Sequence, residues 1–202
     1  GPVTEEYRTI AGNMLYDAQR LLSGFDDLST AAKIETGTYV TEVGSTDCDW
    51  LSLRLAERLR ELSNVLQVTL NLVQAHPVRP FALDNHLAER LFSRLLSAVI
   101  IGCAPGEILD GRFRTELGLN AVNRFVLTLP KKLADMDESE LFGSGPFDES
   151  HDAPLLGLGF SLRLVRSLAR NVGGDLRFYN QALIVSLPAV HDGLTGLKDE
   201  EG

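Results

Sequence analysis

The chain has 202 residues, and its 19 Lys and Arg against 28 Asp and Glu give a formal net charge of −9. Apolar residues make up 44% of the chain and charged residues 23%, a balance typical of a globular protein and not of a disordered one. The negative charge argues against nucleic acid as a partner and against contact with an anionic membrane, because both need a positive surface.

The two cysteines, Cys48 and Cys103, are far apart and in no recognisable spacing. We therefore expect neither a disulfide framework nor a zinc site, and a reduced, cytoplasmic setting fits best. No apolar run reaches the roughly 18–20 residues of a membrane span. The first two residues, Gly-Pro, are typical of the pair that remains after proteolytic removal of a tag, so we expect the natural protein to extend upstream.

A long amphipathic helix is predicted from Thr4 to about Glu35. Thr4 with Glu5 and Glu6 suits a helix start, and Gly37 suits its end. Apolar or small residues recur at spacings of four and three, as in a heptad seam: Met14, Ala18, Leu21, Phe25, Leu28 and Ala32. Such a seam needs a partner, either a second helix of a bundle or dimer or the body of the chain's own domain.

Helices and short strands alternate in the rest of the chain. Helices are predicted over 51–64, 85–101 and 162–171, the second capped by Asp84. Strands are predicted over 39–43, 68–73, 81–83, 108–117, 123–129, 176–179 and 182–187, and an acidic loop over 133–152. This order predicts an α+β fold, a two-layer sandwich in which one mixed sheet carries helices on a single face.

The most specific stretch of the sequence is Leu156-Gly157-Leu158-Gly159-Phe160 at the start of a predicted helix that ends in Gly173-Gly174. A Gly-x-Gly turn that opens a helix can bring backbone N–H groups against a phosphate. By itself the turn is a weak signal, since ordinary loop-to-helix turns also use glycine.

The full string resembles the G2 box of sensor histidine kinases, and other stretches agree with that family in order and spacing. Residues 33–37, Lys-Ile-Glu-Thr-Gly, resemble the end of the second helix of the dimerisation and phosphotransfer bundle. Asp49-Trp50-Leu51 resembles the entry into the ATPase-like domain, Asp84 begins an N-box-like helix, and Leu141-Phe142 with Phe147 resembles the F box. The resemblance implies a Bergerat-type ATPase-like domain over 38–190 and a bundle helix over 1–37. The polar end of the chain, residues 191–202, is expected to be a disordered tail.

The residues that hold nucleotide in this family are replaced here. The two asparagines of the N box, one of which holds Mg²⁺, fall on Ser93 and Ser97, and serine is a poorer Mg²⁺ ligand. The family's phosphate-facing lysine falls on Ile100. The G1 box, D-x-G-x-G, is replaced by residues 128–133, Thr-Leu-Pro-Lys-Lys-Leu, in which only Thr128 offers a weak acceptor for the base.

The segment between the F box and the G2 box carries seven acidic residues and no Lys or Arg between Asp135 and Asp152. A solvated loop is the simplest interpretation, but acids in this place disfavour ATP. Arg163, Arg166 and Arg170 form a basic stripe on the following helix, either solvated or a docking surface for an acidic partner or for this acidic segment. None of His76, His86, His151 and His191 lies in the family's phosphoacceptor motif, so no catalytic residue is assigned.

The first hypothesis is therefore a two-component signal transduction module with a degraded nucleotide site, a pseudokinase or phosphorelay scaffold that serves a response regulator. The second is an active ATP-dependent histidine kinase with a divergent site, in which Gly157, Gly159, Ser93, Ser97 and Thr128 bind ATP and Mg²⁺. The third is a structural dimerisation module. All three include a homodimer through the N-terminal helix, and none assigns a metal ligand.

Overall fold

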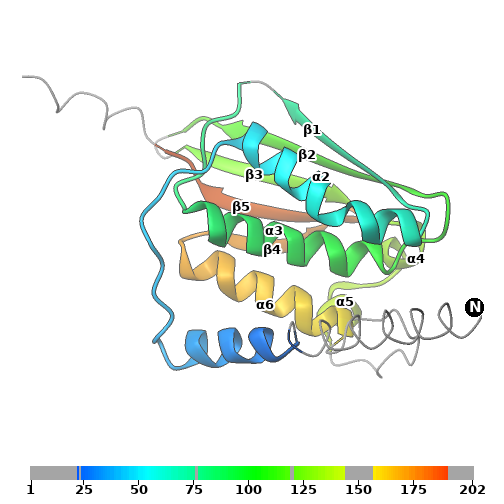
Figure 1. Cartoon of the computed structure of the whole chain (residues 1–202), viewed down its shortest axis with the longest axis horizontal. Helices are drawn as coiled ribbons and strands as arrows, with labels where there is room; N and C mark the ends of the chain where they lie inside the picture. The colour runs from blue at the N-terminus through cyan, green and yellow to red at the C-terminus, as the bar shows by residue number, and fades with distance from the viewer. Residues whose placement is uncertain (1–21, 23, 76, 119–120, 144–156, 191–202) are drawn as a thin grey trace, which may run out of the picture.

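The computed structural model describes residues 22, 24–75, 77–118, 121–143 and 157–190 (Figure 1). The N-terminal helix is described at residue 22 and over 24–35, and the part of that prediction before residue 22 lies outside the described residues. The helix ends as predicted, because Gly37 has a φ of 68° in the left-handed region that glycine tolerates.

One mixed sheet of five strands forms the centre of the fold. In chain order the strands are β1 (Thr69–Ala75), β2 (Ile108–Glu116), β3 (Val122–Thr128), β4 (Asp175–Tyr179) and β5 (Ala182–Pro188). Their order across the sheet is β1-β2-β3-β5-β4, and only the β1–β2 pair is parallel. Along β2 and β3 exposed and buried residues alternate, so each strand turns one row of side chains to the helices.

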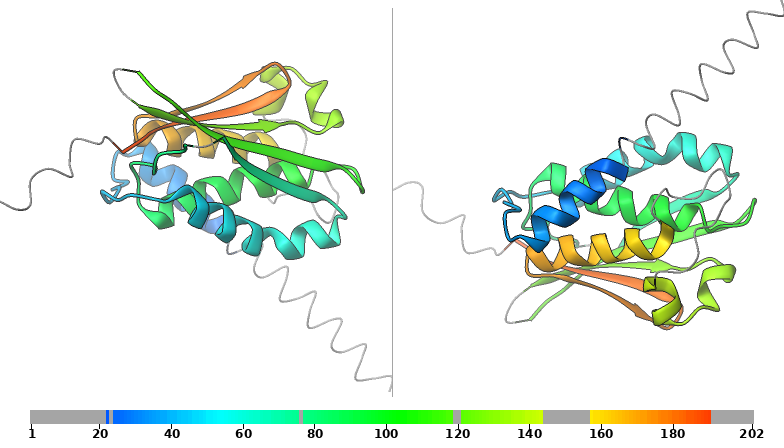
Figure 2. Two further views of the ribbon diagram at one scale, coloured as in Figure 1. Left: turned by 90° about the horizontal axis from the view of Figure 1, so that it is seen from above. Right: turned by 90° about the horizontal axis from the view of Figure 1, so that it is seen from below.

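Three helices cover one face of the sheet: α2 (Cys48–Val65), α3 (Asn85–Ile100) and α6 (Gly157–Asn171) (Figures 1 and 2). The middle helix, α3, contacts both of the others. Asp47 caps α2 by accepting a hydrogen bond from the Trp50 amide, and Asp84 caps α3 by accepting from the amides of His86 and Leu87. Among the described residues no helix covers the other face of the sheet, and the two-layer sandwich predicted from the sequence is confirmed.

The core lies between α3 and the sheet and is built around four phenylalanines. Phe92 of α3 contacts the rings of Phe81, Phe113 and Phe125 at centroid distances of 5.5, 5.5 and 5.3 Å. All four rings are fully buried. These aromatic contacts fix α3 against β2 and β3 and thereby fix the face that α3 presents to solvent.

Two predicted strands are wrong. Residues 39–43 are irregular, and Val40 and Val43 lie exposed, because no neighbouring strand is available to pair with them. Of residues 81–83, only Phe81 makes ladder contacts, as isolated bridges to Thr46 and Ala189. The connector over 39–43 has the β-branched residues typical of a strand, but a strand also needs a neighbouring strand with which to pair.

The predicted acidic loop is partly helical. The end of α4 (Lys131–Ala134) overlaps its start, and α5 (Glu138–Phe142) lies within it. Its part from residue 144 onward, with Phe147, lies outside the described residues. Asp137 and Glu140 form a capping box at the start of α5, so the side chains of these two acids accept hydrogen bonds from nearby backbone amides. Helix α6 begins at Gly157, five positions before the predicted start. Among the helices of the described part, none has the length and apolar character needed to cross a membrane.

Candidate functional site

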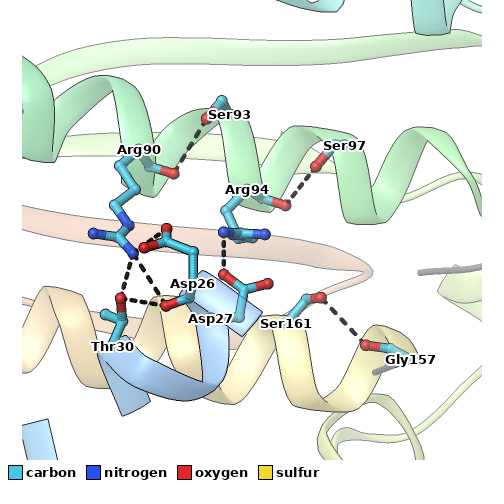
Figure 3. Close-up of polar contacts among 9 residues, drawn as sticks. All are labelled: Asp26, Asp27, Thr30, Arg90, Ser93, Arg94, Ser97, Gly157 and Ser161. Atoms are coloured by element: carbon cyan, nitrogen blue, oxygen red, sulfur yellow. Dashed lines mark hydrogen bonds and ion pairs between the residues drawn. The ribbon is translucent and has the colours of Figure 1, made fainter. Parts of the chain in front are cut away.

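Ser93 and Ser97 lie one turn apart on α3, on the side that faces away from the sheet (Figure 3). Their hydroxyls are satisfied within the helix. Ser93 Oγ donates to the Arg90 carbonyl at 3.2 Å, and Ser97 Oγ donates to the Arg94 carbonyl at 3.1 Å. The two N-box positions therefore offer short hydroxyls already bonded to their own backbone, and no amide oxygen that could reach a metal ion.

Gly157 and Gly159 lie in the first turn of α6, which runs antiparallel to α3, and each has a structural role. Gly157 has a φ of 76°, which favours glycine over any residue with a side chain. At Gly159 an added Cβ would lie 2.0 Å from the Gly143 carbonyl oxygen. The Gly-x-Gly string thus sets the start of α6 and its close contact with the end of α5, and this local packing accounts for both glycines.

Thr128 is not brought together with the other predicted residues. It is the last residue of β3, on the face of the sheet that the helices leave uncovered. There it borders a hollow of about 430 Å³ with Asn71 of β1 and with Asp110 and Arg112 of β2. Since α3 and α6 lie across the other face, Thr128 is turned away from Ser93, Ser97 and the glycines.

The segment that replaces the G1 box contributes leucines to the hydrophobic core. Leu129 and Leu133 are both buried, and α4 begins directly after Pro130. Leu133 packs onto the backbone at the end of α3, where an added Cβ on Gly102 would lie 2.7 Å from Leu133 Cδ1. Ile100, at the place of the family's phosphate-facing lysine, is fully buried.

These residues do not fit ATP and Mg²⁺ in the manner that the sequence resemblance implies. Ile100 replaces the phosphate-facing lysine, the segment after β3 offers no carboxylate to the base, and the two serines offer no carboxylate or amide oxygen to a metal ion. Within the described ranges, no group of three or more His, Cys, Asp or Glu is arranged to hold a metal.

The N-terminal helix lies across the outer face of α3 and is held there by two arginines (Figure 3). Asp26 pairs with Arg90, which also donates a hydrogen bond to Thr30 Oγ1. Asp27 pairs with Arg94 one turn further along α3. The side chains of Asp27 and Thr30 point into this contact, and both residues are buried.

Burial dominates the electrostatics of the Asp27–Arg94 pair. Loss of solvent raises the pKa of Asp27 to about 6, against the opposing effect of the nearby Arg94 and Arg90 guanidiniums. Burial also lowers the pKa of Arg94, although Asp27 works in the other direction. The pair therefore joins the two helices while its charges are held in a poorly solvated environment.

A groove of about 600 Å³ runs between α2, α3 and the N-terminal helix. Its charged and polar lining consists of Asp26 of the N-terminal helix, Arg58 of α2 and six residues of α3: His86, Glu89, Arg90, Ser93, Arg94 and Ser97. Arg58 donates to Glu89 at 2.9 Å. The groove thus combines three guanidiniums and two serine hydroxyls on one surface.

The basic stripe of α6 binds the chain's own acidic segment in part. Arg166 pairs with Glu138 of α5, and its guanidinium lies 3.7 Å from the centroid of the Phe142 ring. Arg163 donates to the carbonyls of Phe142 and Gly143. Arg170 pairs instead with Asp175 at 2.9 Å. The stripe is therefore not simply solvated, and its first two arginines fasten α5 to α6.

The contact made by Asp26, Asp27, Arg90 and Arg94 was not predicted from the sequence. The available signal was weak: Arg90 and Arg94 are spaced for one helix face, and Asp26 and Asp27 lie beside the heptad seam, not on it. Only the crossing of the two helices brings them together. Of the four histidines, His86 lines the groove, and the other three lie outside the described residues.

Comparison with solved structures finds histidine kinases. The chain matches the histidine kinase AdeS of Acinetobacter baumannii with a TM-score of 0.65 at 16% identity, over 88% of this chain and 82% of AdeS. It matches full-length ShkA, solved in complex with AMPPNP, with a TM-score of 0.60 at 15% identity, over 84% of this chain. That match spans only 35% of ShkA. The catalytic domain of the histidine kinase ThkA gives a TM-score of 0.53 at 12% identity, over 73% of this chain and 96% of that domain.

No protein-family model and no curated protein matches the sequence. The structural matches nevertheless agree with the element order, the mixed sheet and the helical face described above. The chain has the fold of the C-terminal region of sensor histidine kinases.

Proposed function

We propose that this chain is a two-component signalling module with a degraded nucleotide site, which acts as a pseudokinase or phosphotransfer scaffold toward a response regulator in the cytoplasm. In this role the ATPase-like domain, residues 38–190, is a docking and regulatory body. The N-terminal helix, within residues 1–37, belongs to the bundle that presents a phosphoacceptor histidine on a helix upstream.

The contact between Leu133 and Gly102 carries this proposal. In the fold, the segment after β3 is the one that the resemblance assigns to recognition of the base. Here it forms α4 and inserts Leu133 against the end of α3, and Leu129 and Ile100 are buried nearby. Restoring a polar pocket would require replacing core side chains, so the loss of nucleotide binding is built into the packing.

An active kinase with a divergent site is less well supported. Its main sequence support was the Gly-x-Gly string, and both glycines have a local structural reason: the positive φ of Gly157 and the close approach of Gly159 to Gly143. ShkA was solved with AMPPNP, but at 15% identity that likeness concerns the fold.

Exposed apolar residues on the N-terminal helix support a homodimer. Leu22, Phe25 and Leu28 are 70%, 73% and 48% exposed, and they lie on the helix face opposite to the one that Asp27 and Thr30 bury. Docking on α3 therefore leaves the heptad seam free for a second copy of the helix. The same observation suits a purely structural dimerisation module, which differs from the main proposal in lacking phosphoryl exchange.

Calorimetric titration with ATP and Mg²⁺ tests the degraded site. We expect no binding heat at millimolar nucleotide, with a nucleotide-binding histidine kinase domain measured alongside as a positive control. A dissociation constant in the micromolar range would contradict the proposal. Phosphoryl exchange with response regulators, measured on the natural protein with its upstream helix, separates the scaffold from the structural module, because the structural module predicts none.

A further inference from the structure

We propose that Arg58, Arg90 and Arg94 form a binding site for a phosphate-bearing anion, and that Asp26 and Asp27 of the N-terminal helix fill this site from within the chain. The site shares Ser93 and Ser97 with the N-box positions of the fold, but its cations are Arg58, Arg90 and Arg94, and it needs neither a base pocket nor Mg²⁺. It therefore goes beyond the proposed function and does not depend on it.

The chemistry of the groove matches a phosphate group. Arg58, Arg90 and Arg94 line one hollow of about 600 Å³, and guanidiniums bind phosphate oxygens in a planar, two-pronged geometry. Ser93 and Ser97 line the same hollow, and their hydroxyls donate to carbonyls of their own helix, at 3.2 and 3.1 Å. A rotation about χ1 turns each hydroxyl toward a bound oxygen.

Two carboxylates of the N-terminal helix already pair with arginines of the groove, and one of them, Asp26, lines the groove itself. Asp26 binds Arg90 and Asp27 binds Arg94, so two anionic groups on one helical turn meet two guanidiniums one turn apart (Figure 3). Thr30 adds its hydroxyl as an acceptor for Arg90. Asp26 and Asp27 thus take the place of an anionic ligand, and residues 36–47 connect them covalently to the domain that they bind.

The tethered carboxylates can be displaced. The side chain of Asp26 is 60% exposed, so its ion pair is well solvated and contributes little. Asp27 is buried, and its burial disfavours the carboxylate form. With Asp26 and Asp27 withdrawn, Glu89 is the one acid that remains in the described lining against three arginines, and the groove becomes clearly cationic.

The test compares the wild-type chain with the double variant Asp26→Asn, Asp27→Asn, which keeps side-chain volume and removes both anions. Inorganic pyrophosphate and ATP are titrated separately, both without Mg²⁺, by calorimetry at low salt. We expect the double variant to bind pyrophosphate at least tenfold more tightly than the wild type. Adding Arg90→Gln and Arg94→Gln to the double variant should abolish the gain.

A matched control is Arg54→Gln on the same background. Arg54 belongs to the neighbouring ion-pair network with Glu57 and Glu89 but does not line the groove, so its loss should leave the affinity within twofold. Circular dichroism and thermal unfolding of each variant confirm that the fold is retained. Comparing pyrophosphate with ATP shows which part of the ligand is recognised. Equal affinities mean that the phosphate groups alone are bound. A tighter affinity for ATP identifies a nucleotide as the ligand.

The proposal is overturned if the double variant binds pyrophosphate no better than the wild type, or if the arginine variants keep the full affinity. Its failure is distinguishable from failure of the proposed function. Tight binding of ATP with Mg²⁺ to the wild type, unchanged by Arg90→Gln and Arg94→Gln, would contradict the degraded nucleotide site alone.

Discussion

Asp27 and Arg94 form an ion pair that is almost closed to solvent, with 7% and 17% of the two side chains exposed. Through this pair the N-terminal helix is joined to the middle helix of the ATPase-like domain, and Asp26 with Arg90 repeats the contact one turn away. The position of the domain against the N-terminal helix thus depends on a few charged groups, which makes it sensitive to substitution and to pH.

Docking of the N-terminal helix is expected to weaken as the pH rises from about 4 to about 7. The pKa of Asp27 is raised from 3.8 to about 6 by burial, so the docked state holds a proton that the undocked state releases. The stabilisation is full below pH 3.8 and is lost as the pH passes 6, and the difference in pKa corresponds to at most ~3 kcal/mol. Hydrogen exchange of the amides of residues 24–35, measured across this pH range, should show less protection as the pH rises.

Asp27→Asn is the control for this pH dependence. An amide has no proton to release, so the exchange of residues 24–35 in the variant should show the intrinsic pH dependence of exchange and no further change. Asp26, Arg90 and Arg94 face the same carboxyl and remain in place. Equal pH profiles in the variant and the wild type would show that another group controls docking.

Leu133→Ala should destabilise the domain by about 2–4 kcal/mol, because it removes a buried side chain that packs on the end of α3. The neighbouring Lys132→Ala, at an exposed position of α4, should change stability by less than about 0.5 kcal/mol. Urea unfolding gives both free energies. A small loss for Leu133→Ala would mean that the segment after β3 is not part of the core, and it would reopen the question of a nucleotide pocket there.

Local patterns in the sequence were enough to predict most of the fold. Asp84 was identified as the cap of α3, and the alternation of residues in β2 and β3 predicted their hairpin, because capping and burial leave signals within a few positions. The strand predicted over 39–43 failed because pairing depends on a partner that the local sequence does not show. The polar contacts of Asp26 and Asp27 were not predicted for the same reason, since they exist only where two helices cross.

The candidate site was predicted less well than the fold. The sequence alone showed that Ser93 and Ser97 replace the N-box asparagines and that Ile100 replaces the phosphate-facing lysine. The structure adds that Ile100 is buried. The resemblance also placed Thr128 near the nucleotide. The direction of its side chain depends on the register of β3 against β5, which pairs it with Ala182 and leaves it on the uncovered face of the sheet.

Gly159→Ala should destabilise the domain more than Gly157→Ala. The added Cβ at residue 159 would meet the Gly143 carbonyl oxygen at 2.0 Å, so α5 or α6 must shift, at a cost of about 1–3 kcal/mol. At residue 157 no atom lies within 4 Å of the added Cβ, and only the positive φ is unfavourable, at about 1–2 kcal/mol. Thermal unfolding of both variants gives the order, and the reverse order would contradict a packing role for Gly159.

Self-association through the exposed apolar stripe should depend on Phe25 and Leu28. A dimer has twice the 22.1 kDa mass of one chain, and light scattering at rising protein concentration should detect it in the wild type. Phe25→Glu with Leu28→Glu places like charges in the seam of both copies and should shift the chain to a monomer. Lys33→Glu, at an exposed position outside the stripe, should leave the dimer intact. A wild-type chain that stays monomeric at high concentration would show that the stripe does not pair with a second copy, whereas a dimer that survives the double variant would place the interface elsewhere.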